Sequence, residues 1–182
     1  MRVFEGILYD VYQWQQKTFD DNHAIHEMLR RQDTVLVIGI DGDRAMIVND
    51  TQPHRGMLVG FPGGRVSHED SSTLEAAQRE TREETGVSFA HWKLVAVVQP
   101  ATKVEHFVYA YIAWGVTARD KPMLDAGGEK IDVRWVDYAS LCELSGDELP
   151  AIVDRIYAAG SIKALIDTPE YVGELVDIAT KR

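Results

Sequence analysis

The chain has 182 residues, 45% of them hydrophobic and 26% charged, and its 29 acidic against 19 basic residues give a net charge of −10 at pH 7. This length and composition predict one globular domain with a sizeable core, and no apolar run is long enough to suggest a membrane span or a secretory leader. We therefore expect a cytoplasmic protein with no membrane partner, whose acidic surface excludes long nucleic acid as the main partner.

The first half of the chain reads mainly as β-strands. Phe4 to Trp14 mixes β-forming and polar residues and predicts an N-terminal strand or hairpin. Thr34–Ile40 is a continuous apolar run typical of a buried strand, and Asp41-Gly42 turns it into a second strand over Ala45–Val48. A further strand, Met57–Phe61, ends at a Pro-Gly-Gly turn.

The acid-rich segment that follows predicts a helix over Thr73–Thr85. Ser72 and Glu75 have the spacing of a capping box, and Gly86 stands just beyond the last turn. Small or modest side chains on one side of this helix would let it pack closely on a sheet.

Three carboxylates, Glu80, Glu83 and Glu84, follow one another on this helix at positions i, i+3 and i+4. This spacing places them on one face, where they repel each other unless something neutralises them. Converging carboxylate oxygens suit a hard divalent cation, Mg²⁺ or Mn²⁺. Arg79, one turn before Glu83, could hold that carboxylate in position.

The second half continues with strands and ends with helices. The expected elements are strands over Leu94–Val98, Glu105–Trp114 and Ile131–Val136, and helices over Ala151–Ala159 and Tyr171–Ala179. The pattern favours an α+β fold, an α/β/α sandwich in which helices enclose a mixed sheet.

Gly63-Gly64, the acidic loop, Arg79-Glu80, Glu83-Glu84 and Gly86-Val87 together resemble the Nudix hydrolase signature, G-x5-E-x7-R-E-U-x-E-E-x-G-U with U aliphatic. The loop is one or two residues longer than the signature, so Glu69 and Asp70 both remain candidates for its first acid, and Thr81 stands at an aliphatic position. The resemblance implies a Nudix domain over residues 34–182. It also implies metal ligands chosen from Glu80, Glu83, Glu84, Glu69, Asp70 and the Gly64 carbonyl.

Gln52 and Arg55, followed by Phe61-Pro62-Gly63-Gly64, resemble the Gln-x-Arg and Leu-Pro-x-Gly arrangement of the ADP-ribose and nucleoside-diphosphate-sugar pyrophosphatases, with one additional residue between Gln52 and Arg55. This resemblance implies substrate-binding roles for Gln52, Arg55, Arg31 and Gly63, and implies that Glu84 or Glu129 positions or deprotonates the attacking water. It also implies that residues 1–33 form a β-extension that contributes to a homodimer. Arg30 and Arg31 could alternatively be a solvated helix end.

The implied activity is Mg²⁺-dependent hydrolysis of a nucleoside diphosphate derivative, most simply ADP-ribose or a nucleotide sugar, to a nucleoside monophosphate and a sugar phosphate. Two alternatives stay open from the sequence. One is a Nudix-fold module that binds a nucleotide without cleaving it, and the other is a pyrophosphohydrolase that sanitises (d)NTPs.

Overall fold

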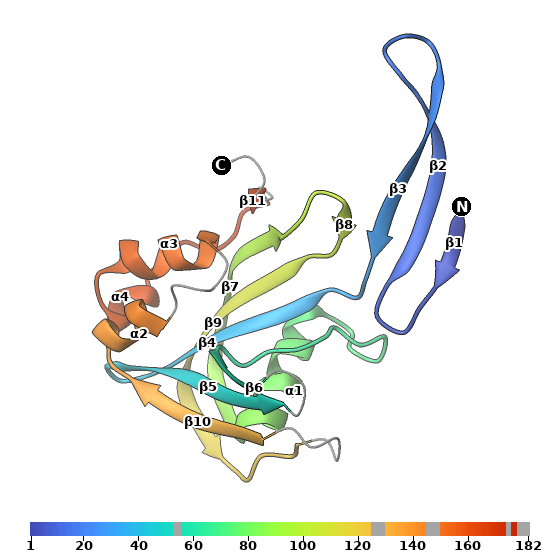
Figure 1. The fold of residues 1–182 in the computed structure, drawn as a ribbon. Coiled ribbons are helices and arrows are strands. Elements are labelled where there is room, and N and C mark those ends of the chain that lie inside the picture. Colours follow the sequence, from blue (N-terminus) through green and yellow to red (C-terminus); the bar gives the residue numbers. More distant parts are fainter. Residues whose placement is uncertain (53–55, 125–129, 145–149, 174–175, 178–182) are drawn as a thin grey trace.

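The structure, a computed structural model, describes residues 1–52, 56–124, 130–144, 150–173 and 176–177. These residues form two β-sheets and the helices that cover the larger of them (Figure 1). Arg55 and Glu129, both singled out from the sequence, lie outside the described residues.

The larger sheet has seven strands and is mixed. Its order is β10-β5-β4-β9-β7-β11, and β4 runs parallel to β9. Strand β5 pairs with β4 through its first residues and with β6 through its last ones. The strands are β4 (Thr34–Asp41), β5 (Arg44–Gln52), β6 (Gly56–Gly60), β7 (Val87–Gln99), β9 (Val108–Arg119), β10 (Lys130–Val136) and β11 (Val176–Asp177). The helices are α1 (Thr73–Thr85), α2 (Tyr138–Leu144), α3 (Pro150–Ala159) and α4 (Ile162–Leu165).

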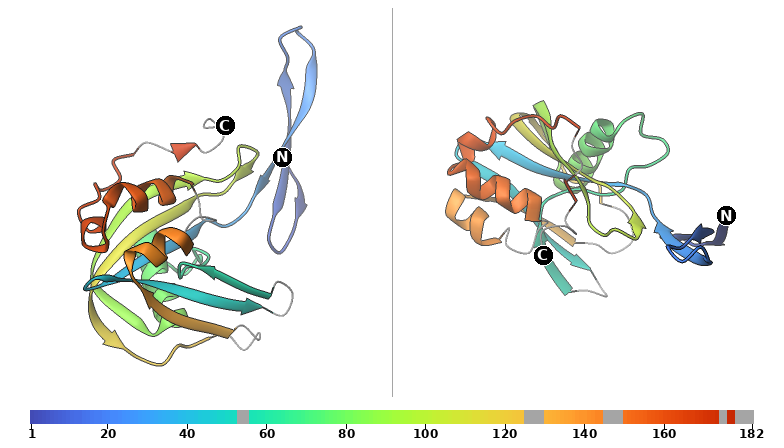
Figure 2. Two further views of the ribbon diagram at one scale, coloured as in Figure 1. Left: turned by 60° about the vertical axis from the view of Figure 1, so that its left-hand side comes forward. Right: turned by 90° about the horizontal axis from the view of Figure 1, so that it is seen from above.

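Helices cover both faces of this sheet because β4 is apolar on both sides. Val35 and Val37 pack in one cluster with Ala76 and Ala77 of α1. Ile38 belongs to a second cluster, to which α2, α3 and α4 contribute buried side chains. Successive residues of a strand point to opposite faces, so the two clusters lie on opposite sides of the sheet. In Figure 2 the green helix α1 accordingly lies apart from the orange and red helices α2 to α4, with strands of the sheet between them. The predicted α+β sandwich is confirmed.

The N-terminal residues form a separate four-stranded sheet. Its order is β1 (Arg2–Glu5), β2 (Asp10–Lys17), β3 (His23–Arg30) and β8 (Val104–Glu105), and the β2–β3 hairpin projects from the core as an arm (Figure 1). The alternative of a helix end at Arg30 and Arg31 is wrong, because Arg30 ends β3. Eight residue pairs join β2 to β3, and this cross-strand pairing cannot be seen in local sequence.

The strands expected around Thr34–Ile40, Ala45–Val48, Met57–Phe61 and Ile131–Val136 are present, as are the helices over Thr73–Thr85 and Ala151–Ala159. The helix expected over Tyr171–Ala179 is wrong. The Tyr171 N–H donates to the Leu94 carbonyl at 2.9 Å, and Val176–Asp177 then pairs in parallel with Val98 and Gln99. Hydrogen bonds to the backbone groups along the open edge of β7 stabilise this extended segment more than its weak helical pattern would stabilise a helix. Among the described residues, no helix has the length and apolar character needed to cross a membrane.

Candidate functional site

The glycine turn lies along the first half of β4. Strand β5 pairs with β4 only beside the turn that joins them, which leaves the earlier backbone groups of β4 available. The Val37 N–H donates to the Pro62 carbonyl and the Val35 N–H to the Gly64 carbonyl, both at 2.9 Å. A Cβ on Gly63 would lie 2.1 Å from the Val35 carbonyl oxygen, so only glycine allows this approach.

Helix α1 begins and ends as its sequence predicts. The Ser72 side chain caps it by accepting from the Glu75 N–H at 3.1 Å, and Gly86 closes it with φ at 70°. The Glu75 carboxylate accepts from the Ser71 N–H at 2.8 Å, one residue before the position that a standard capping box would use. Because Ala76, Ala77 and Thr81 are buried against the sheet, the acidic face is turned towards the glycine turn.

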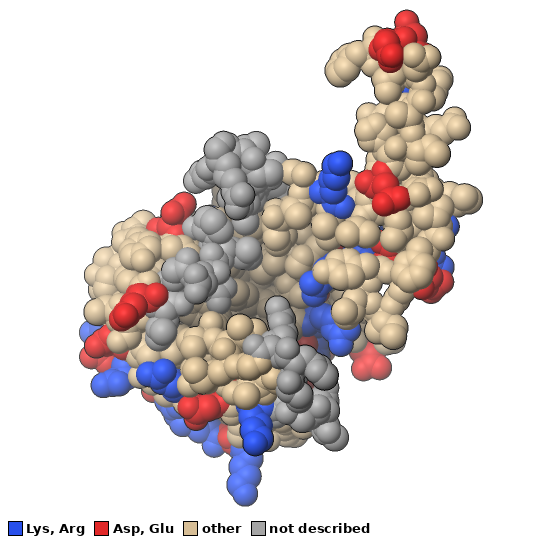
Figure 3. Space-filling view, in the orientation of Figure 1, with Lys and Arg blue, Asp and Glu red and all other residues tan. Residues whose placement is uncertain are grey.

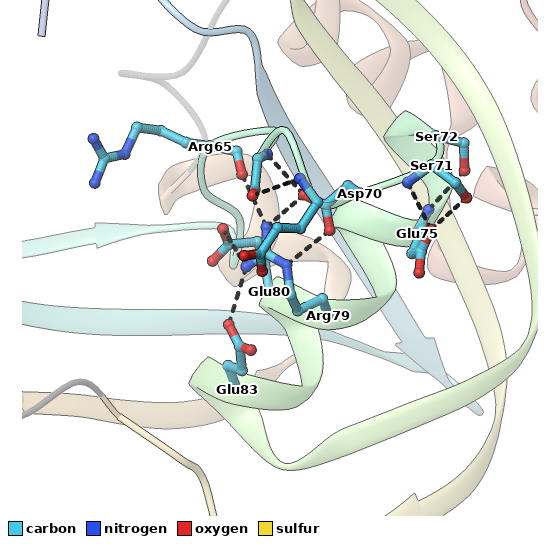
Figure 4. Close-up of polar contacts among 10 residues, drawn as sticks. Arg65, Asp70, Ser71, Ser72, Glu75, Arg79, Glu80 and Glu83 are labelled. Atoms are coloured by element: carbon cyan, nitrogen blue, oxygen red, sulfur yellow. Dashed lines mark hydrogen bonds and ion pairs between the residues drawn. The ribbon is translucent and has the colours of Figure 1, made fainter.

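Arg79 is the centre of the polar network on that face (Figure 4). Its guanidinium forms a two-point ion pair with Asp70, with Nε to Oδ1 at 2.9 Å and Nη2 to Oδ2 at 2.8 Å. It also donates to Glu80 at 2.9 Å, to Glu83 at 3.1 Å and to the Arg65 carbonyl at 3.0 Å. One arginine thus ties the loop before α1 to two of the three carboxylates.

The Asp70 carboxylate is held in the ion pair with Arg79. Its side chain is only 4% exposed, and Oδ2 also accepts from the Ser67 N–H at 2.7 Å. The hydrogen bonds from Arg79 are the main reason that the pKa of Asp70 is lowered from its ordinary value. Glu69 is exposed, and its backbone N–H donates to Ser67 Oγ at 3.1 Å.

Glu80 is more enclosed than Glu83, with 16% of its side chain exposed against 37%. Burial raises its pKa, and the hydrogen bond and charge of Arg79 oppose that rise. A Cβ on Gly64 would lie 2.4 Å from the Glu80 carboxyl carbon. The absence of a side chain at Gly64 therefore makes the space that the Glu80 carboxylate occupies.

Arg79, the three helix carboxylates and the glycine turn line one cleft of about 520 Å³, whereas Asp70 and Glu69 are not among its lining residues. Glu84 spans it, because its Oε2 accepts from the Gly63 N–H at 3.0 Å. Two further lining residues contact each other, because Gln52 Nε2 donates to Asp50 Oδ2 at 2.7 Å. The lining residues are Gln32, Asp50, Gln52, Gly63, Gly64, Arg65, Ser67, Arg79, Glu80, Glu83 and Glu84.

Comparison with known proteins gives the family directly. Residues 30–156 match the family model described as the NUDIX domain. The chain belongs to the Nudix family. It is a Nudix hydrolase, an enzyme of the pyrophosphohydrolase class. No curated protein matches the chain.

Two solved structures share the Nudix fold at low sequence identity. An ADP compounds hydrolase is 18% identical with a TM-score of 0.67, and the match covers 91% of this chain and 87% of that one. A MutT structure, from work on the fish pathogen Aliivibrio salmonicida and on Vibrio cholerae, is 20% identical with a TM-score of 0.55, and the match covers 71% of this chain and 98% of that one. The part of this chain before the Nudix match contains most of β1 to β3.

The cleft has the oxygen donors that a Nudix metal site needs. Glu80, Glu83, Glu84 and the Gly64 carbonyl all belong to residues that line it, and the carboxylates suit Mg²⁺ or Mn²⁺. Among the described residues, no three His, Cys, Asp or Glu side chains converge closely enough to hold a metal ion. The contacts explain this arrangement, because Arg79 holds Glu80 and Glu83 while the Gly63 N–H holds Glu84. The three glutamates therefore fit a divalent cation by their chemistry. To bind it together, their carboxylates would have to turn towards one another.

The substrate-binding residues expected from the sequence do not all line the same cleft. Gln52 and Gly63 line the cleft. Arg31 lies instead in a neighbouring hollow of about 400 Å³, with its guanidinium carbon 5.7 Å from the centre of the Tyr9 ring. Gln32 lines both spaces and so connects them.

Sequence reasoning missed Gln32 and Asp50. Gln32 carried no signal of its own, since it stands between an arginine and an aspartate just before β4. Asp50 stands two residues before Gln52 in a strand, so the two side chains share a face, and that spacing could have identified it.

Proposed function

We propose that this Nudix hydrolase cleaves the pyrophosphate of a nucleoside diphosphate joined to a second group, ADP-ribose or a nucleotide sugar, in a Mg²⁺-dependent reaction. The products are a nucleoside monophosphate and a sugar phosphate. The observation that carries the proposal is the cleft in which Glu80, Glu83 and Glu84 of one helix face the Gly63-Gly64 turn. Such a cleft combines carboxylates for a cation with a backbone that a phosphate can approach closely.

In this reaction a water oxygen bonds to one phosphorus, and the bridging oxygen leaves with the electron pair of the broken P–O bond. Bound Mg²⁺ supplies neutralisation of the phosphate oxygens and activation of water. Glu84 or Glu129 accepts the proton that the water loses. Arg79 acts through Glu80 and Glu83, because its hydrogen bonds fix where these two carboxylates can point.

The choice of an ADP-linked substrate over a (d)NTP is supported by the extent of the fold similarity. The match to the ADP compounds hydrolase covers 91% of this chain and the match to MutT covers 71%. The cleft is also continued by a second space whose wall includes Met57, Leu58, Phe61 and Ile131, which suits the nucleoside of such a substrate.

The test is a substrate panel in Mg²⁺ or Mn²⁺ containing ADP-ribose, UDP- and GDP-sugars, NADH, diadenosine polyphosphates and dNTPs. We expect AMP from ADP-ribose, and turnover lowered by orders of magnitude in Glu83→Gln and in Glu84→Gln with unchanged unfolding. Glu75→Gln, on the same helix but outside the cleft, is the matched control. Binding of ADP-ribose without product would support the nucleotide-binding module, and a higher kcat/KM for dNTPs would support the sanitising enzyme.

The proposal includes an intracellular enzyme that acts as a homodimer through its N-terminal sheet. Apolar side chains of this sheet, including Phe4 and Ile25, are exposed, as is Phe19 in the turn between β2 and β3. In the view of Figure 3 most of the arm formed by β2 and β3 is uncharged. Light scattering after size-exclusion chromatography should give a dimer for the wild type and a smaller species for Ile25→Glu, and a monomeric wild type would contradict the proposal.

A further inference from the structure

We propose that Asp50 recognises the ribose of the nucleoside half of the substrate, accepting hydrogen bonds from its hydroxyl groups, and thereby makes the enzyme select ribonucleotides over deoxyribonucleotides. This inference rests on the proposed function, because it assumes that the pyrophosphate lies against the carboxylates of α1. It adds a specificity residue that the sequence motif does not contain.

The first observation is an unpaired acceptor. Asp50 Oδ2 accepts from Gln52 Nε2 at 2.7 Å, whereas Oδ1 is shielded from solvent and has no hydrogen-bond partner within the described ranges. A buried carboxylate oxygen without a donor is unfavourable, and its presence in a folded protein calls for an explanation. A ligand hydroxyl is the kind of group that would satisfy it, and a carboxylate is a common acceptor for ribose hydroxyls.

The second observation is the position of Asp50 between two connected spaces. Asp50, Gly63 and Glu84 line both the carboxylate cleft and the adjoining space of about 630 Å³. Gly64, Glu80 and Glu83 line the carboxylate cleft and not the adjoining space. Besides these shared residues, the adjoining space is lined by Gly60 and Glu143 and by the apolar residues Val48, Met57, Leu58, Val59, Phe61 and Ile131.

The order of these surfaces matches the order of groups in a nucleotide. The pyrophosphate belongs beside the carboxylates that would hold its cation, and the flat, largely apolar base belongs against the apolar wall. The ribose joins these two groups covalently, so it must pass the boundary where Asp50 lies. The apolar wall also decides which end of the substrate lies there, because it suits a base better than a second sugar.

The strand places Asp50 there by register. Asp50 pairs with Leu58 of β6 on one side and with Ile131 of β10 on the other, which centres it among three strands. Its neighbour Asn49 points to the opposite face because strand residues alternate. A shift of one residue would replace the carboxylate at the cleft by an amide.

The experiment compares ADP-ribose with analogues that lack the 2′- or 3′-hydroxyl of the adenosine, or the 2-hydroxyl of the terminal ribose. Each is tested with the wild type, Asp50→Asn, Asp50→Ala and the control Asp132→Asn, which removes an exposed carboxylate from the neighbouring strand β10. The readouts are kcat and KM for each pair, dissociation constants by calorimetry in Ca²⁺, and Mn²⁺ affinity by electron paramagnetic resonance. The calorimetry needs no turnover, so it tests Asp50 even if no analogue is cleaved and the proposed function fails.

We expect the wild type to prefer ADP-ribose over an adenosine-deoxy analogue by about tenfold or more, mainly through KM. Asp50→Ala should lower kcat/KM for ADP-ribose by about tenfold to a hundredfold and change that of the adenosine-deoxy analogue by less than about threefold, with Mn²⁺ affinity unchanged. Equal losses for both substrates would overturn the proposal in favour of a structural role. A tenfold fall in Mn²⁺ affinity, or discrimination only at the terminal ribose, would overturn it as well.

Discussion

Replacing Asp70 by alanine tests whether this residue, and not Glu69, anchors helix α1 through Arg79. Asp70 receives two hydrogen bonds from Arg79, at 2.8 and 2.9 Å, and one from the Ser67 N–H at 2.7 Å, and its side chain is only 4% exposed. Arg79 is 27% exposed and keeps Glu80, Glu83 and a carbonyl as partners. Asp70→Ala should therefore lower the unfolding free energy by about 2–3 kcal/mol, which is less than the loss expected when a fully buried ion pair is broken.

The assay is urea unfolding of Asp70→Ala and Glu69→Ala beside the wild type. Because the Glu69 side chain is exposed, its removal should change the unfolding free energy by less than about 0.5 kcal/mol. Turnover in Mg²⁺ should fall about tenfold in Asp70→Ala, since Arg79 loses the contact that fixes its direction towards Glu80 and Glu83.

The pH dependence gives a second readout. The Arg79 hydrogen bonds hold the pKa of Asp70 below its usual value of 3.8, so the stabilisation from ionised Asp70 is complete above that value and is lost as the pH falls through the lower, folded-state pKa. The stability difference between wild type and Asp70→Ala should be constant from about pH 7 to pH 5 and shrink below about pH 4. A larger loss in Glu69→Ala than in Asp70→Ala, or a difference that grows on acidification, would refute the assignment.

Three further predictions concern the glycine turn and α1. Gly64→Ala places a methyl group 2.4 Å from the Glu80 carboxyl carbon and should lower kcat by tenfold or more. The control Gly42→Ala, at φ 61° with open space around it, should cost about 1 kcal/mol of stability without affecting turnover. Thr81 is fully buried with no partner for Oγ1 within the described chain, so Thr81→Val should raise the unfolding free energy by about 1 kcal/mol at unchanged activity. Burial raises the pKa of Glu80, so its ionised form destabilises the fold as the pH rises through that raised value. Glu80→Gln should therefore be the more stable protein in EDTA at neutral pH, an advantage that should vanish below pH 4.5 and that Mn²⁺ should reverse; a less stable variant in EDTA would contradict this explanation.

The parts of the site that were predictable are those fixed by local spacing. Helix α1 runs over the predicted residues, with the predicted cap at Ser72 and the predicted glycine end at Gly86. Its three glutamates share a face because of helix geometry alone. The close approach at Gly63 and Gly64 was likewise expected from residue type, although the structure shows that Gly63 meets the backbone of β4 and Gly64 meets Glu80.

The parts that were not predictable depend on contacts between distant segments. The competition between Glu69 and Asp70 could not be decided by counting, because the longer loop shifts both, whereas the pairing of Arg79 with Asp70 distinguishes them at once. The C-terminal segment was expected to be helical, but the free edge of β7 recruits Val176–Asp177 as a strand.

The sequence by itself thus determined the family, helix α1 and the carboxylates that suit a cation, because these follow from the signature, from i, i+3 and i+4 spacing and from local capping. Only the tertiary structure decided which acid holds Arg79, and that Gln32, Asp50 and Gln52 complete the cleft. Asp50 and Gln52 come from β5 and Gln32 from the segment just before β4, and the register of β5, which no local pattern specifies, selects which of its side chains line the cleft.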